Sequence, residues 1–128
     1  MESDYLKIDE KVILIRINKR YRHGMLGEEL YHNTRGVWYV KKERCRDASY
    51  AMAIYGGEIK EVYKIISWYK AKTTEYKYRE DLSNRFVPNR LEFVGEVARD
   101  NIRNKYVGKS VVHYFNKGNQ NPIFYMNC

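Results

Sequence analysis

The sequence has few cysteines and no long apolar segment. Among its 128 residues only Cys45 and Cys128 are cysteines, the first in a charged stretch and the second at the last position. Their spacing predicts neither a disulfide framework nor a four-ligand metal site. No apolar stretch approaches the ~18 residues that span a bilayer, and the first residues lack signal-peptide character. We therefore expect a reducing, cytoplasmic setting and no membrane partner.

Catalytic and cofactor motifs are also scarce. His23, His32 and His113 are scattered and have none of the spacings typical of metal sites. The tripeptide at 108–110 (GKS) resembles the end of a phosphate-binding loop, but Arg103 stands where that loop requires glycine. No nucleophile has an obvious general base beside it. The sequence thus predicts no metal and no cofactor, and it favours a non-enzymatic role while leaving activity open.

What the sequence does have is positive charge and aromatic rings. It carries 24 Lys and Arg against 16 Asp and Glu, which gives a formal net charge of +8. A basic protein attracts polyanions by raising their local concentration and association rate. Thirteen tyrosines and two tryptophans add flat faces on which bases can stack, at roughly 1–3 kcal/mol per base. Composition therefore favours nucleic acid or a small nucleotide as the partner.

The clearest structural signal is a β-hairpin. Residues 50–55 (YAMAIY) and 58–69 (EIKEVYKIISWY) are rich in aromatic and β-branched residues, and Gly56 and Gly57 lie between them. In the second run the apolar positions change from odd to even numbers, which predicts a β-bulge near Ile65 and Ile66. This hairpin sets the expected architecture.

The rest of the chain mixes short strands and short helices. Length and a hydrophobic share of 44% predict one domain over residues 1–128. The charged run 41–47 is expected to be a solvated loop or turn, and 70–89 a long surface connection. Periodicity predicts strands over 12–17, 37–40, 91–97 and 123–126, and helices over 25–33, 98–106 and from 110. The fold class is therefore α+β: a small mixed or antiparallel barrel of five or six strands with two or three short helices.

Several side chains suited to holding a base or nucleotide are spread along the sequence. Indole faces can stack on a base, amides can read its edge, and arginine or lysine can hold phosphate. We expect these groups to meet at one mouth of the barrel. The candidate binding residues are Arg35, Trp38, Trp68, Tyr69, Arg79, Lys109, Asn119, Gln120 and Asn121.

The order of the elements resembles the PUA-like superfamily of small β-barrels, which includes EVE, YTH, ASCH and SRA-type domains. The resemblance covers most of the chain, and its motif-like parts are RGVW at 35–38 and the strand end at Trp68 and Tyr69. It implies recognition of a modified base, often flipped into an aromatic pocket, with Trp38 and Trp68 as the walls. The chain is also similar to an uncharacterised bacterial and phage-associated module found beside GIY-YIG-type nuclease domains, through segments such as LIRINKRYRHGM, TRGVWYV, RLEFVGEVA, YVGKS and NQNPIFYMN.

Three functions follow as hypotheses. The first is a non-enzymatic domain that reads a modified base in nucleic acid through an aromatic pocket with a basic rim. The second is a phage or bacterial defence protein that binds and sequesters a free signalling nucleotide. The third is a small nuclease or RNA-processing enzyme. A reader should bind polymers with steep salt dependence, because phosphate contacts release counterions.

Overall fold

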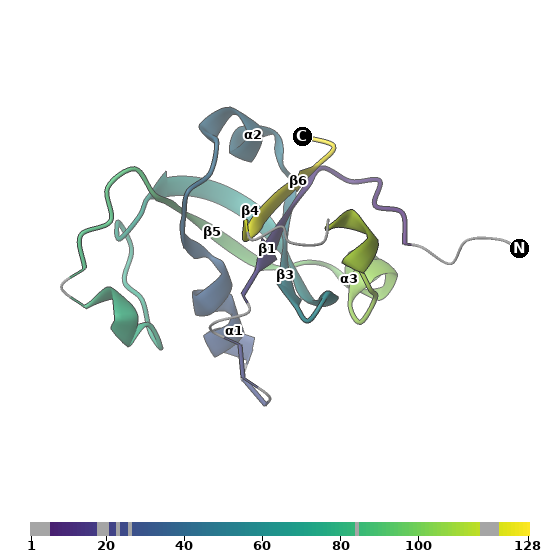
Figure 1. The fold of residues 1–128 in the computed structure, drawn as a ribbon, viewed down its shortest axis with the longest axis horizontal. Coiled ribbons are helices and arrows are strands. Elements are labelled where there is room, and N and C mark those ends of the chain that lie inside the picture. Colours follow the sequence, from purple (N-terminus) through teal and green to yellow (C-terminus); the bar gives the residue numbers. More distant parts are fainter. Residues whose placement is uncertain (1–5, 18–20, 23, 26, 84, 116–120) are drawn as a thin grey trace, which may run out of the picture.

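A six-stranded, strongly curled sheet forms the centre of the protein (Figure 1). The structure is a computed structural model, and it describes residues 6–17, 21–22, 24–25, 27–83, 85–115 and 121–128. The strands are β1 (Val12–Arg16), β2 (Gly36–Trp38), β3 (Tyr50–Tyr55), β4 (Glu58–Lys70), β5 (Leu91–Val97) and β6 (Ile123–Met126). The α-helices are α1 (Gly27–Thr34), α2 (Lys42–Asp47) and α3 (Asp100–Tyr106), and short 3-10 turns lie at Glu80–Leu82 and Val112–Tyr114.

The sheet is mixed and open. Its strand order is β2-β5-β4-β3-β1-β6. Only the pair β1 and β3 is parallel among the strands described, and the other pairs are antiparallel. Strands β2 and β6 are the two edges, and the sheet curls into a half-barrel without closing. The predicted α+β class, with six strands and three short helices, is confirmed at this level.

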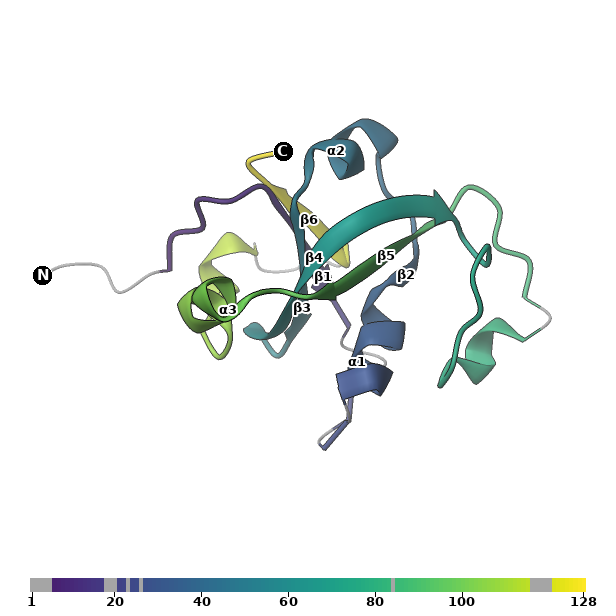
Figure 2. The same cartoon turned by 180° about the vertical axis from the view of Figure 1, so that it is seen from behind.

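The predicted hairpin and bulge are both present. Strands β3 and β4 pair antiparallel around a turn in which Gly56 (φ +59°) and Gly57 (φ +76°) take conformations that side chains disfavour. The register between β4 and β5 shifts between Ile65 and Ser67, which leaves the intervening Ile66 62% exposed. Strand β4, which contains the bulge, forms a long arch (Figure 2).

The core lies on both faces of the sheet, as the continuous apolar run in β1 predicts. Ile13 and Ile15 point into one hydrophobic cluster, and Val12 and Leu14 point into the other. All four side chains are fully buried, so both faces of the sheet are covered at β1. The two clusters of the core thus hold the centre of the sheet in place from both faces.

Two regions differ from the sequence predictions. The charged run expected to be a loop is the helix α2, and Cys45 within it is buried. The segment expected to be a helix from Ser110 forms only a 3-10 turn at Val112–Tyr114. Segment 71–90 is a long connection as predicted, and it projects from the end of β4 and β5 that lies away from α3 (Figure 1). In the described part of the chain, no helix has both the length and the apolar character to cross a membrane.

Candidate ligand-binding pocket

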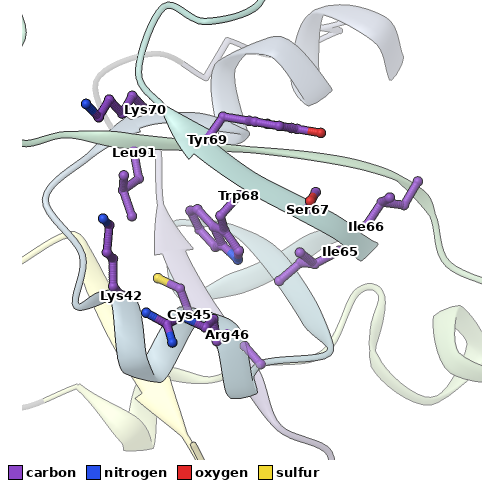
Figure 3. Close-up of a pocket in the computed structure, with 11 residues that line it drawn as sticks. Lys42, Cys45, Arg46, Ile65, Ile66, Ser67, Trp68, Tyr69, Lys70 and Leu91 are labelled. Atoms are coloured by element: carbon purple, nitrogen blue, oxygen red, sulfur yellow. The ribbon is translucent and has the colours of Figure 1, made fainter.

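A cavity of about 590 Å³ lies between α2 and the C-terminal part of β4 (Figure 3). This volume falls within the range of about 300–1,000 Å³ that small-molecule sites occupy. The cavity is partly open to solvent. Its lining comprises Lys42, Cys45, Arg46, Ala48, Ile65, Ile66, Ser67, Trp68, Tyr69, Lys70 and Leu91.

The helix supplies one wall of the pocket through residues that share a face. Lys42 stands three residues before Cys45 and four before Arg46, so its side chain is a neighbour of both on the helix surface. Cys45 is buried in the hydrophobic core and anchors the helix, while Lys42 and Arg46 are exposed. The helix therefore holds two cations at the rim of the cavity.

Strand β4 supplies the opposite wall. Trp68 and Lys70 are two residues apart, so they lie on the same face of the strand. Trp68 points from β4 toward α2 (Figure 3), and its ring packs against Phe93 with centroids 5.4 Å apart. The indole is partly exposed, and its Nε1 is buried with no hydrogen-bond partner in the described part of the chain. Trp68 thus offers a fixed aromatic surface inside a basic rim.

The rim carries positive charge without internal compensation. Lys42, Arg46 and Lys70 are exposed, and no described residue forms an ion pair or hydrogen bond with their side chains. No carboxylate lines the cavity. Cations held together without neutralising partners focus positive potential and attract anions. The electrostatics of the pocket therefore favour a negatively charged ligand.

The thiol of Cys45, which lines the cavity, is poorly suited to act as a nucleophile. Burial raises the pKa of Cys45 to about 12, with further contributions from Cys128 and Glu43. Nucleophilic cysteines need a thiolate, which positive or polar surroundings favour by lowering the pKa. At neutral pH Cys45 is a protonated, apolar part of the wall. The pocket is therefore better suited to binding than to thiol chemistry.

Only part of the predicted constellation is found at this pocket. Trp68 and Tyr69 both line it. Tyr69 is 42% exposed and points away from the cavity centre, as expected for the residue after Trp68 on a strand (Figure 3). Lys109 lies instead beside β4 near the hairpin turn, where its carbonyl accepts a hydrogen bond from Ile59 N. Its side chain is exposed and does not line this pocket.

Trp38 is not a wall of the pocket, which corrects the prediction from sequence. Its side chain is only 8% exposed and belongs to the hydrophobic core. Its Nε1 donates a 2.7 Å hydrogen bond to the carbonyl of Thr34, at the end of α1. A ring with buried faces and a satisfied N–H has no surface left for a base. Trp38 instead fixes β2 to α1.

Arg35 and Arg79 are also structural rather than exposed, contrary to their expected role at the barrel mouth. Arg35 donates to Thr74 Oγ1 (2.7 Å) and to the carbonyl of Glu75 (2.6 Å), and its guanidinium lies 3.8 Å from the ring centroid of Tyr76. Arg79 donates to the carbonyls of His32 and Gly36 and to Asp81. Both arginines are at most 5% exposed. They bind the long connection 71–90 to α1 and β2.

A buried carboxylate completes this arrangement. Glu92 is fully buried and accepts hydrogen bonds from the backbone N–H groups of Lys72 (2.7 Å) and Thr74 (2.8 Å) and from Thr74 Oγ1 (2.6 Å). Arg35 Nη1 lies 3.9 Å from the same carboxylate. We call the residues that join the long connection to α1, β2 and β5 the loop clamp: Arg35, Thr74, Tyr76, Arg79 and Glu92.

The three amide candidates near the C-terminus do not reach the pocket where they can be described. Asn121 is exposed, and its Oδ1 accepts a hydrogen bond from the backbone N–H of Ile123 at the start of β6. It performs the turn function that asparagine commonly has. Asn119 and Gln120 lie outside the described residues.

Sequence reasoning missed the cations of the pocket. Lys42, Cys45 and Arg46 belong to the run that was expected to be a solvated loop, and Lys70 was placed in the long connection. No local signal identifies them: Cys45 is the single apolar residue in the run 41–47, and one apolar residue cannot show a helical period.

Comparison with known proteins found no matching family model, no matching curated protein and no matching solved structure. The candidate site therefore depends on the geometry of the pocket alone. That geometry combines an aromatic surface, an apolar floor and a rim of three cations.

Proposed function

We propose that this protein binds a base or nucleotide in the pocket between α2 and β4, without chemistry, and that its ligand is a modified base in nucleic acid. The observation that carries the proposal is the position of Trp68 inside a rim of three uncompensated cations. A base would stack on the indole, and Lys42, Arg46 and Lys70 would hold the adjoining phosphates.

The floor of the pocket supports selectivity for a modified base. Ala48, Ile65 and Leu91 provide apolar contacts around the indole, and Ser67 adds a hydroxyl that can donate or accept a hydrogen bond. A methyl group on a base would gain from such a floor, at about 0.8 kcal/mol for a buried methylene-sized group. We therefore expect methylated bases to bind more tightly than unmethylated ones.

The curled six-stranded sheet is compatible with the resemblance to PUA-like base readers. In that superfamily the base enters an aromatic pocket, and here Trp68 is the aromatic wall that remains after Trp38 is assigned to the core. The proposal therefore keeps the mode of recognition and changes the residues that carry it to Trp68, Lys42, Arg46 and Lys70.

The test is binding of single-stranded 12-mers of DNA and RNA, with and without a methylated cytosine or adenine, measured by calorimetry. Trp68→Ala should weaken binding about 5- to 150-fold, since base stacking on an aromatic ring is worth roughly 1–3 kcal/mol. The matched control is Phe86→Ala, which removes an aromatic ring that is 87% exposed on the connection after β4. Equal affinity in wild type and Trp68→Ala would contradict the proposal.

The same experiment separates the alternative functions. A protein that sequesters a free nucleotide would bind nucleoside phosphates and ignore the 12-mers. A nuclease would shorten the 12-mers when a divalent metal is added, which gel electrophoresis detects. Intact 12-mers bound with steep salt dependence would favour the reader.

A further inference from the structure

A second, smaller cavity of about 250 Å³ lies on the opposite face of the sheet from the pocket. Tyr50 and Lys64 are directly opposite each other in the ladder between β3 and β4, so their side chains share one face. Tyr50 packs against the hydrophobic cluster that contains Val62, whereas Ile65 and Trp68 pack against the other cluster. The sheet therefore separates the two cavities. We call the second one the basic hollow, and it is lined by Tyr50, Lys64, Arg99, Asn101 and Ile102.

The side of the basic hollow that faces the sheet is closed by the start of α3, which is fixed to β4 at two points. The backbone N–H of Ala98, just before the helix, donates to the carbonyl of Val62 at 2.9 Å. Arg103, within the helix, pairs with Glu61 at 2.8 Å. The residues of this segment that line the hollow lie between these two attachments. The hollow is therefore formed by elements that are held in place by other contacts.

The polar side chains of the basic hollow are available to a ligand. Lys64 and Arg99 are exposed, and no carboxylate lines the hollow. Glu96 lies opposite Lys64 in the ladder between β4 and β5, yet the two form no ion pair. Four polar side chains of the lining have no hydrogen bond or ion pair with any residue in the described ranges: Tyr50, Lys64, Arg99 and Asn101.

Two other cations on α3 differ from those of the basic hollow. Arg103 pairs with Glu61, and Lys105 pairs with Glu10 at 2.8 Å. The carboxylates near α3 thus neutralise these two cations and leave Lys64 and Arg99 without partners in the described part of the chain. Two adjacent cations that lack partners raise the local positive potential and attract anions.

We propose that the basic hollow binds a phosphate monoester group, independently of the base pocket and of its proposed function. Such a group carries a charge of about −1.5 to −2 at neutral pH and three oxygens that are strong acceptors. Lys64 and Arg99 match this charge, and the hydroxyl of Tyr50 and the amide of Asn101 supply neutral donors. The volume is below the range of about 300–1,000 Å³ typical of ligand pockets, so it suits the phosphate group rather than a whole nucleotide. A phosphate diester, with a single charge, should bind less tightly.

The experiment is a titration with inorganic phosphate and with dimethyl phosphate, a diester, followed by amide NMR spectroscopy. Inorganic phosphate should produce saturable shifts at Lys64 and at residues 99–102, and dimethyl phosphate should bind there more weakly. Lys64→Ala/Arg99→Ala should weaken phosphate binding about 10-fold or more, since one hydrogen bond to a charged group contributes about that factor. The charge-matched control is Lys7→Ala/Lys109→Ala, whose residues are exposed and lie outside both cavities. It should leave the affinity unchanged.

The source of the phosphate group is identified with two further probes, adenosine monophosphate and a single-stranded 12-mer that carries a terminal phosphate. Whichever of the three phosphates binds the hollow most tightly indicates whether a free ion, a nucleotide or a strand end is the preferred ligand. The same 12-mer without its terminal phosphate should produce no saturable shifts at the hollow.

The outcomes separate this inference from the proposed function. Trp68→Ala should leave the shifts at the hollow unchanged, because the sheet lies between the indole and the hollow. Phosphate shifts confined to residues of the pocket would overturn the inference and leave the proposed function standing. Equal affinity for inorganic and dimethyl phosphate, or a double variant that behaves like its control, would also overturn it.

Discussion

The pocket and the loop clamp use the same side-chain chemistry for opposite purposes. Both place arginine or lysine beside aromatic rings. In the clamp, Arg35 uses its Nη1 and Nη2 groups on Thr74 and Glu75 and is buried. In the pocket, Arg46 is exposed and has no internal hydrogen bond within the described ranges. The difference in partners, rather than the residue types, distinguishes a structural cation from one available to a ligand.

Burial explains why the two regions diverge. A charged group removed from water is costly unless it is paired and hydrogen-bonded, so the buried carboxylate of Glu92 requires three donors and a nearby guanidinium. An exposed cation keeps its hydration and its long-range field. The clamp therefore holds the connection 71–90 against α1 and β2, whereas the cations of the pocket remain available to attract anions.

The largest predicted effect is a loss of stability when the clamp is broken. Arg35→Ala removes the donors to Thr74 and Glu75 and leaves Glu92 without its guanidinium, which should cost about 3–5 kcal/mol of unfolding free energy. Arg46→Ala, the matched control from the pocket, should change it by less than about 0.5 kcal/mol. Urea denaturation of both variants measures this difference.

Oligonucleotide binding by the same two variants also tests the division between clamp and pocket. Arg46→Ala should weaken the binding of oligonucleotides although it leaves the fold intact. If Arg35→Ala remained as stable as wild type and lost oligonucleotide binding, then Arg35 would belong to the ligand site and the division between clamp and pocket would be wrong.

A smaller difference is predicted for the two tryptophans. Trp38→Phe removes the N–H that binds the buried carbonyl of Thr34, so it should cost about 1–3 kcal/mol for the unsatisfied group. Trp68→Phe removes an N–H that has no partner among the described residues, so no hydrogen bond is lost. Thermal and urea unfolding of the two variants provide the measurement. Equal losses would mean that the N–H of Trp68 finds a partner, such as water.

The local elements of this fold could be predicted from the sequence because their signals are local. The hairpin is encoded by two β-rich runs around Gly56 and Gly57, and the bulge by a change of phase near Ile65 and Ile66. Each signal needs only residues that are adjacent in the chain. The helix α2 was missed because six residues, five of them charged, are too few to show a helical period.

The fate of the RGVW motif could not be predicted, since its partners are distant in sequence. Gly36 is needed because a Cβ there would come within 2.0 Å of the hydroxyl of Tyr76, and Arg35 meets residues some 40 positions away. Trp38 is enclosed by the core. The sequence identifies residues whose side chains could bind a ligand. Only the tertiary packing decides whether those side chains are already buried against other parts of the protein.

The smallest predicted effect concerns pH, which should act on the clamp and not on the pocket. Nδ1 of His32 accepts hydrogen bonds from Arg35 Nε and from the backbone N–H of Lys77, both at 3.4 Å. Burial, followed by the charge of Arg35, lowers the pKa of His32 below its ordinary value. The pocket lining contains no histidine and no carboxylate. Titration between pH 7.5 and 5.5 therefore distinguishes the two regions.

The direction in which the unfolding free energy changes with pH follows from the lowered pKa of His32. Above about pH 6.5 the imidazole is neutral in both states and its contribution is complete; below that value the unfolded chain binds a proton that the folded chain resists. Unfolding free energy should therefore fall as the pH decreases below about 6.5, by less than about 1.4 kcal/mol per pH unit. His32→Asn, whose amide oxygen can accept in place of Nδ1, should flatten this dependence in urea titrations at pH 7.5, 6.5 and 5.5. An unchanged slope in that variant would assign the pH dependence to another group and leave the clamp insensitive to pH.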